Sequence, residues 1–173
     1  MTLEEEIFSR HIGKNIALDS NLLLVLIAGL LDLRLFKSFK RLGDYTVEDH
    51  QLLVRLLGSF KVLVTTPHVL TEACNLANSL SESYKLRWHA VLAAMAASEN
   101  VKLGLREEWK SMAVLAGRSE FLPFGLTDTA LAELSTQALL LTEDYRLSGF
   151  LKYRGIPVLN FGDLRKLRLF ANG

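Results

Sequence analysis

Four acidic residues of this 173-residue chain have the side chains best suited to chemistry: Asp19, Glu72, Asp128 and Asp144. Asp19 and Asp144 each come just after a short apolar segment that is typical of a buried strand. Carboxylate oxygens are the ligands that hard divalent cations prefer. Carboxylates that share a pocket repel one another, and a bound cation or proton relieves this repulsion. If the four acids converge, the sequence predicts a divalent-cation site.

Each acid also has a purely structural interpretation. Asp19 precedes Ser20 and Asn21, and all three residue types are favoured as helix N-caps. Asp128 and Asp144 suit the positively charged first turn of a helix, and Glu72 has the spacing of an ordinary surface residue within a helix. Taken singly, each acid favours the structural role. The hypothesis of a cation site therefore depends on the acids arriving together.

Short apolar runs that alternate with helical patterns supply the elements that would bring the acids together. Strands are expected at 16–18, 62–65, 101–105, 138–142 and 156–159. Helices are expected at 4–11, 21–31, 46–57, 67–80, 82–97, 107–115 and 127–135, and from Asp144 to about 154, with 117–125 as an irregular connection. This alternation predicts an α/β fold with a parallel sheet of about five strands covered on both faces, and Pro157 places the last strand at an edge. The carboxyl ends of parallel strands share one edge, where ligands bind.

The composition and charge of the chain indicate which broad classes of protein it fits. Half of the residues are hydrophobic and the chain has one cysteine, so we expect one domain, residues 1–173, with a sizeable core and no disulfide. A net charge of +1 argues against a general nucleic-acid coat protein. The longest apolar run, 22–31, is too short to span a bilayer, and the first ten residues do not resemble a secretion signal. We therefore expect a cytoplasmic protein without a membrane partner.

Five fragments occur in an order that resembles the PIN-domain nucleases. They are Leu-Asp-Ser-Asn-Leu-Leu at 18–23, Thr-Pro-His-Val-Leu-Thr-Glu at 66–72, Leu-Thr-Asp-Thr-Ala at 126–130, Leu-Thr-Glu-Asp-Tyr-Arg-Leu at 141–147 and Gly-Ile-Pro-Val-Leu-Asn at 155–160. Each fragment is weak by itself. The ordered set covers nearly the whole chain and is similar to the family in its sequence of motifs.

The resemblance implies a three-layer α/β/α fold and a divalent-metal-dependent endoribonuclease that hydrolyses RNA phosphodiester bonds with Mg²⁺ or Mn²⁺. It assigns both the catalytic and the metal-binding role to Asp19, Glu72, Asp128 and Asp144. It also implies that Asn21 and Thr142 are polar helpers near the acids. One metal ion and two metal ions both remain open.

A basic segment follows the first long helix and is expected next to the acidic edge. Its cations, Arg34, Lys37, Lys40 and Arg41, are interleaved with apolar residues, which is typical of an amphipathic helix with a solvated face. Such a segment can also contact phosphate. With an RNA substrate, Lys37, Lys40 and Arg41 become the expected RNA-binding residues.

The biological role has several interpretations. The chain is longer than the commonest small bacterial PIN toxins, with the added length expected at 33–59 and 107–125. One expectation is the toxin of a type II toxin–antitoxin pair, which would have a protein antitoxin and a homodimer among its partners. The alternative is an RNA-processing protein, or a PIN-like RNA-binding or scaffold protein that does not cleave.

Other readings of the residues are weaker. A receiver-type domain also uses acids at strand ends, but it would place a lysine after its last active-site strand, and none occurs there. The four histidines lack the spacing of metal ligands, and His68 beside Pro67 is typical of a first-turn surface residue. Trp88 and Trp109 can stack on bases, but their positions in expected helices favour the core or a partner interface.

Overall fold

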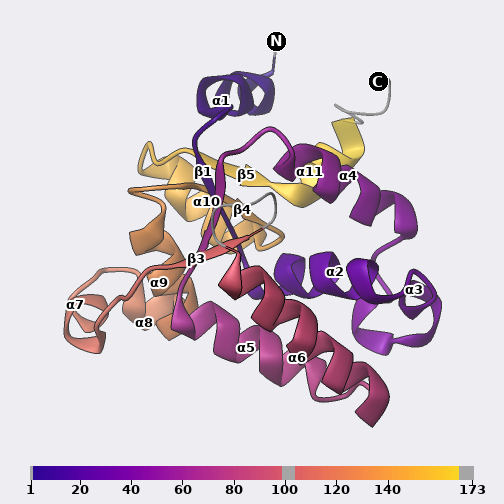
Figure 1. Cartoon of the computed structure of the whole chain (residues 1–173). Helices are drawn as coiled ribbons and strands as arrows, with labels where there is room; N and C mark the ends of the chain where they lie inside the picture. Colours follow the sequence, from indigo (N-terminus) through magenta and orange to yellow (C-terminus); the bar gives the residue numbers. More distant parts are fainter. Residues whose placement is uncertain (1, 99–103, 168–173) are drawn as a thin grey trace.

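A five-stranded, all-parallel sheet forms the centre of the molecule in a computed structural model that describes residues 2–98 and 104–167 (Figure 1). The strands are β1 (Asn15–Leu18), β2 (Val62–Thr65), β3 (Leu105–Glu107), β4 (Leu139–Thr142) and β5 (Val158–Asn160). Their order is β3-β2-β1-β4-β5, so β1 is central and the three-residue strands β3 and β5 are outermost. The chain order therefore reverses its direction across the sheet between β1 and β4, which is where open α/β sheets bind ligands.

Helices cover the sheet on both sides. They are α1 (Leu3–His11), α2 (Ser20–Leu31), α3 (Leu35–Ser38), the 3₁₀ helix η1 (Lys40–Leu42), α4 (Val47–Leu57), α5 (Pro67–Ala77), α6 (Glu82–Ala97), α7 (Met112–Ala116), α8 (Phe121–Phe124), α9 (Leu126–Leu134), α10 (Tyr145–Tyr153) and α11 (Phe161–Leu167). Helices α9 and α10 lie on one side of the strands, and α2 and α4 lie on the other (Figure 1). The expected α/β architecture, with helices on both sides of a parallel sheet, is confirmed.

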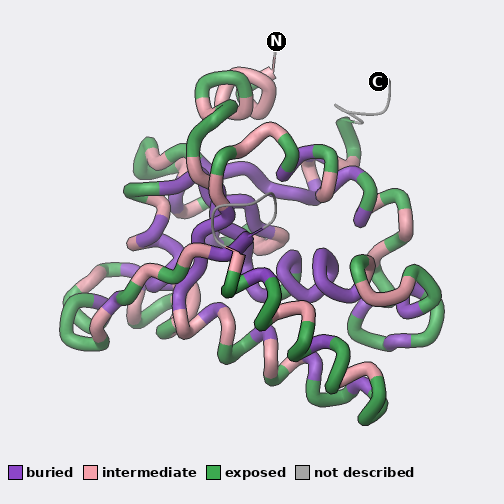
Figure 2. The backbone as a smooth tube through the Cα atoms, in the orientation of Figure 1, coloured by how far each residue is buried: buried purple, intermediate pink, exposed green. Residues whose placement is uncertain are grey.

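The core is built on β1, β4 and α2. Strands β1 and β4 carry continuous apolar residues because both of their faces are covered. Helix α2 is buried from Leu22 to Ala28, and its backbone is among the most buried segments in Figure 2. Gly29 near its end packs against the ring of His50, since a Cβ atom at that position would lie 2.1 Å from His50 Cδ2. This close approach fixes α4 against α2.

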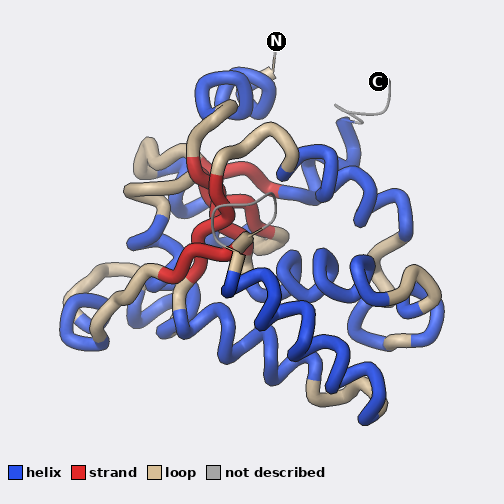
Figure 3. Tube along the Cα trace, in the orientation of Figure 1, coloured by secondary structure: helices blue, strands red, loops and turns tan. Residues whose placement is uncertain are grey.

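Local capping signals set where the helices begin (Figure 3). Thr46 and Asp49 form a capping box at the start of α4. Thr66 accepts a hydrogen bond from the Val69 amide, and Pro67 occupies the first turn of α5. This fixed start places Glu72 on the second turn of α5.

Several expectations differ from the structure. The helix expected at 67–80 ends at Ala77, and the last strand begins at Val158. The third strand begins at Leu105 rather than ending there, and the expected positions 101–103 lie outside the described residues. The helix expected at 107–115 is reduced to α7, because Glu107 pairs with Thr65 in the sheet. The connection 117–125 contains the short helix α8, and helix α11 was not expected from the sequence.

None of the helices within residues 2–98 and 104–167 is both long enough and apolar enough to cross a membrane.

Candidate metal centre

The carboxyl ends of the neighbouring strands β1 and β4 bring two of the acids to the point where the strand order reverses. Asp19 follows β1 and caps α2, and Asp144 follows β4 and caps α10. The Asp19 amide also donates a hydrogen bond to the Leu141 carbonyl oxygen (3.2 Å), so the pairing of the two strands continues up to the acids. The capping role that the sequence favoured for each acid alone is therefore confirmed, and it holds both carboxylates at one edge.

Asp19 has a fixed and nearly buried carboxylate, with 7% of its surface exposed. Its Oδ1 accepts a hydrogen bond from the Leu22 amide (2.8 Å). Its Oδ2 accepts one from the Thr142 hydroxyl (2.6 Å) and one from the Glu143 amide (2.7 Å). Burial nevertheless raises the pKa of Asp19, and its hydrogen bonds oppose that rise. A carboxylate has about four lone-pair directions, two on each oxygen. Oδ2 uses both of its own and Oδ1 uses one, so one lone pair of Oδ1 remains for a cation.

Thr142 is the fully buried residue that links the two caps. Its hydroxyl donates to Asp19 and accepts a hydrogen bond from the Asp144 amide (3.0 Å). Asp144 uses a single oxygen, Oδ1, to accept from the amides of Arg146 (2.7 Å) and Leu147 (3.0 Å). The expected position of Thr142 beside the acids is confirmed, and the capping bonds of Asp144 leave its Oδ2 for other ligands.

Glu72 lies on the exposed side of α5 and faces the start of α2. Its Oε2 accepts a hydrogen bond from the Ser20 hydroxyl (3.2 Å). Asn21, the expected polar helper, is exposed on the first turn of α2, and its side chain has no hydrogen bond described. Ser20 was missed because the helix was expected to begin one residue later. Its only sequence signal is its place directly after Asp19.

Asp128 joins the other three acids electrostatically. It is half-buried in the first turn of α9, and its pKa is raised to about 6. Burial is the largest cause, followed by the negative charges of Asp144, Glu72 and Asp19. The guanidinium of Arg146 partly opposes the rise. Asp128 thus lies within electrostatic range of the other three acids, although the four are spread over 126 positions, from 19 to 144.

The donor set around this edge consists of oxygen atoms. Carboxylates and the hydroxyls of Ser20 and Thr142 provide it, which suits Mg²⁺ or Mn²⁺ rather than a softer metal. Among residues 2–98 and 104–167, no three His, Cys, Asp or Glu side chains lie close enough together to coordinate one metal ion directly. Mg²⁺ keeps several of its waters and uses only one or two carboxylates directly, so acids that reach it through water fit this ion. We call Asp19, Glu72, Asp128 and Asp144 the acidic cluster.

Two charged neighbours were not expected from the sequence. Glu143, between Thr142 and Asp144, is half-buried, and burial raises its pKa while Arg165 opposes the rise. Its Oε1 lies 3.7 Å from Arg165 Nη1. The guanidinium of Arg146 lies over the Phe124 ring at 5.5 Å from its centroid and remains exposed. Arg146 is therefore a cation held beside the acidic cluster.

The basic segment lies at the far end of α2 from the acidic cluster. The twelve residues of α2 separate them by about 18 Å. Lys37 on α3 and Lys40 and Arg41 on η1 are all exposed, and Arg41 Nε donates a hydrogen bond to the Ser79 hydroxyl (3.4 Å). Lys40, Arg41 and Ser79 line a hollow of about 580 Å³. The segment is thus further from the edge than its sequence position suggests, and its role in RNA binding stays a prediction.

No protein-family model, no curated protein and no solved structure matches the chain.

Proposed function

We propose that the protein is a divalent-metal-dependent endoribonuclease. The observation that carries the proposal is the placement of Asp19 and Asp144 at the adjoining ends of β1 and β4, where the Thr142 hydroxyl links them. Asp128 lies close enough that its pKa is raised to about 6, first by burial and then by the charges of Asp144, Glu72 and Asp19. Such an arrangement costs free energy unless a cation offsets the charge, and it is typical of a site whose purpose is metal binding or catalysis. The order of the sequence motifs, which resembles the PIN-domain nucleases, supports RNA as the substrate.

In this proposal Asp19 and Asp144 hold the cation, because their orientations are fixed by the caps of α2 and α10. A bound divalent cation would polarise the scissile phosphate and lower the pKa of a coordinated water. Asp128, which is deprotonated above about pH 6, would accept a proton from the attacking water. The water oxygen forms a bond to phosphorus as the bond to the leaving oxygen breaks. The leaving oxygen would take up a proton from solvent and Asp128 would release its proton there, so the products are a phosphate monoester and a free hydroxyl.

We expect RNA cleavage to stop in chelator and to return when Mg²⁺ or Mn²⁺ is added. Glu72→Gln should lower the rate at least about tenfold, because it removes one charge near the cation, and 1.36 kcal/mol corresponds to tenfold. Glu72 is exposed, so this change should leave folding intact. The assay follows fragments of a mixed RNA on a gel, and Glu82→Gln on the exposed start of α6 is the matched control.

Two results would contradict the proposal. One is cleavage that continues unchanged in chelator. The other is a Glu72→Gln protein that cleaves as fast as the Glu82→Gln control. RNA that binds without cleavage under every cation tested would favour the PIN-like binding or scaffold protein instead.

The proposal also covers the biological role of the protein and its partners in the cell. We propose a cytoplasmic hydrolase that acts as the toxin of a type II toxin–antitoxin pair, with a protein antitoxin and a second copy of itself as partners. RNA processing is the alternative role. Co-expression with the protein encoded beside it would distinguish them, because an antitoxin should suppress both growth arrest and cleavage.

We propose that the basic segment binds a part of the RNA that lies at a distance from the cleaved phosphodiester. Replacing Lys37, Lys40 and Arg41 by alanine should weaken RNA binding and reduce the slope of log K against log salt by about 2, since each single-strand phosphate contact contributes about 0.7. Binding is measured in chelator at several salt concentrations. The control replaces the exposed Lys14 and Lys61, which precede β1 and β2 at the opposite edge of the sheet. An unchanged slope in the triple variant would reject the segment as an RNA contact.

A further inference from the structure

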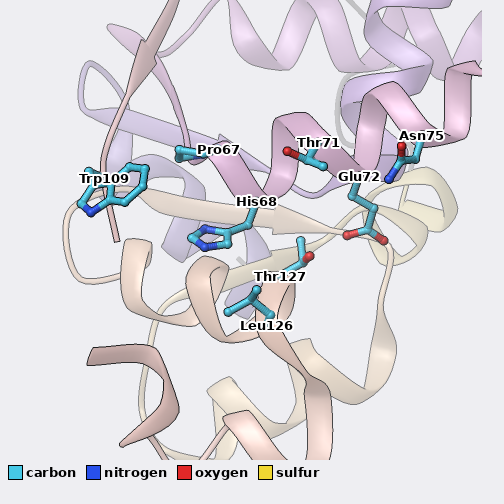
Figure 4. A pocket seen from close by; sticks show the side chains of 8 residues that line it. All are labelled: Pro67, His68, Thr71, Glu72, Asn75, Trp109, Leu126 and Thr127. Carbon is cyan, nitrogen blue, oxygen red and sulfur yellow. The ribbon is translucent and has the colours of Figure 1, made fainter. Parts of the chain in front are cut away.

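A cleft of about 380 Å³ opens beside the acidic cluster, between the start of α5 and the start of α9 (Figure 4). Trp109 stands at one end, and Glu72 of the acidic cluster stands at the other. His68 and Thr127 lie between them. The volume falls within the range of about 300–1,000 Å³ that is usual for small-ligand pockets. A group bound in this cleft would therefore adjoin the proposed metal centre.

Trp109 gives the cleft a flat aromatic surface. It lies in the loop after β3 rather than in the expected helix, and 74% of its surface is exposed. Trp88, by contrast, is fully buried in the core. Tryptophan is enriched at interfaces, because its large ring contributes apolar contact area and its N–H group can donate a hydrogen bond. Aromatic side chains in this setting bind unpaired nucleobases by stacking.

The walls of the cleft suit a neutral, planar, hydrogen-bonding group. Thr71, Asn75 and Thr127 provide hydroxyl and amide groups, which can donate and accept hydrogen bonds. His68 Nδ1 is buried and has no hydrogen-bond partner among the described residues, so turning the ring would bring unused hydrogen-bonding capacity to the cleft. None of the described lining residues is Lys or Arg, and Glu72 is the acid among them. This charge opposes a phosphate inside the cleft and favours an uncharged base.

We propose that this cleft binds one unpaired nucleobase of the RNA, stacked on Trp109, with the adjoining phosphodiester over the acidic cluster. The inference rests on the proposed nuclease function and adds how the substrate is held. The base must be unpaired to enter the cleft, so the substrate is single-stranded at the cut. The phosphate remains outside, where Arg146 supplies the nearby positive charge.

The test uses the quenching of tryptophan fluorescence by iodide, because Trp109 is exposed and Trp88 is not. With Mg²⁺ present, a five-nucleotide oligoadenylate with hydrolysis-resistant linkages should lower the quenching of Trp109 at least twofold. An abasic pentamer with the same phosphates should not. In an anisotropy assay, Trp109→Ala should weaken oligoadenylate binding about tenfold, and Trp109→Phe should recover part of it. Leu122→Ala, which removes an apolar side chain that is 93% exposed outside the cleft, is the control.

The outcomes separate the cleft from the catalytic proposal. Base-dependent protection of Trp109 in a protein that never cleaves supports the cleft and contradicts the nuclease. Metal-dependent cleavage without protection, together with a normal Trp109→Ala protein, overturns the cleft and leaves the nuclease standing. Equal protection by the abasic pentamer also overturns it, since charge alone would then explain binding. Protection by a peptide but not by oligoadenylate would identify a protein-binding cleft and overturn base binding as well.

Discussion

Asp128→Asn is expected to stabilise the cation-free protein at neutral pH while lowering RNA cleavage by about a hundredfold. The pKa of Asp128 is about 6 in the folded chain, against an ordinary value of 3.8 for aspartate. Below about pH 4 both states hold the proton, and the stabilising effect of this carboxyl is complete. It is lost as the pH rises through 6, because ionisation creates a half-buried charge that the negative charges of Asp144, Glu72 and Asp19 also oppose. Asparagine cannot ionise and so avoids this loss.

The size of the effect follows from the pKa. Because Asp128 is only half-buried, solvent reduces the gain in the free energy of unfolding at pH 7.5 to roughly 1–2 kcal/mol. At pH 4 the variant and the parent should be about equally stable. Urea unfolding in chelator at pH 4, 5.5 and 7.5 measures this, and Asp44→Asn at an exposed position is the control. The loss of cleavage corresponds to about 3 kcal/mol of catalytic stabilisation.

The same pKa predicts how the parent protein responds to cations and pH. Mg²⁺ should raise the stability of the parent more than that of Asp128→Asn, since a ligand stabilises the state that binds it. Parent cleavage should fall as the pH drops through about 6, because protons then compete for Asp128. A variant that is less stable than the parent at pH 7.5, or that keeps full activity, would remove Asp128 from the site.

Asp19→Ala should cost roughly 2–4 kcal/mol in the free energy of unfolding and abolish cleavage. The change removes the cap of α2 and leaves the Thr142 hydroxyl and the Glu143 amide without their acceptor. Release of a buried carboxylate offsets part of this cost, since burial already raises the pKa of Asp19. Asp19→Asn should cost only about 1 kcal/mol, because an amide oxygen in the Oδ2 position keeps both acceptor bonds and sacrifices the cap.

A double-mutant cycle with Thr142→Val tests whether the lost Thr142–Asp19 hydrogen bond contributes to the lower stability of Asp19→Ala. In the parent, Thr142→Val removes a donor to Asp19 and an acceptor for the Asp144 amide. In the Asp19→Ala background the donor has already lost its partner, so the second change should cost less by about 1 kcal/mol or more. Chemical denaturation at pH 7 measures all four proteins. Strictly additive costs would show that the Thr142–Asp19 hydrogen bond contributes nothing to stability.

Much of the fold could be predicted because its signals are local. Thr46 and Thr66 mark helix starts by capping chemistry alone, and the apolar runs of β1 and β4 require a covered sheet. β3 was misplaced for the opposite reason. Arg106 and Glu107 give this outer strand a polar pattern, and their helix-compatible sequence is overridden by pairing with β2, which lies over forty residues earlier. Long-range pairing of this kind leaves no short-range signal.

Some features of the candidate site also have local sequence signals, and others depend on tertiary packing. Asp19 and Asp144 could be placed because each lies within two residues of the end of a strand, and the sheet order then brings them together. The contact of Ser20 with Glu72 depends on how α2 packs against α5, which lies more than thirty residues later in the chain. The position of Arg146 beside Asp128 and the cleft at Trp109 depend on how α9 and the loop after β3 pack. These features arise from tertiary structure, so the spacing of residues in the sequence does not predict them.

The short outer strands also bear on how two copies of the chain could meet. β3 and β5 are three residues each, and Pro157, which has no backbone N–H to donate, directly precedes β5. Helices α1 and α11 contact β5, and Arg106 and Glu107 place charges on β3. Short, charged or covered rims oppose the pairing of a sheet with a foreign strand. Extension of the sheet into a continuous dimer or an aggregate is therefore disfavoured, and self-association is directed to the helical surface.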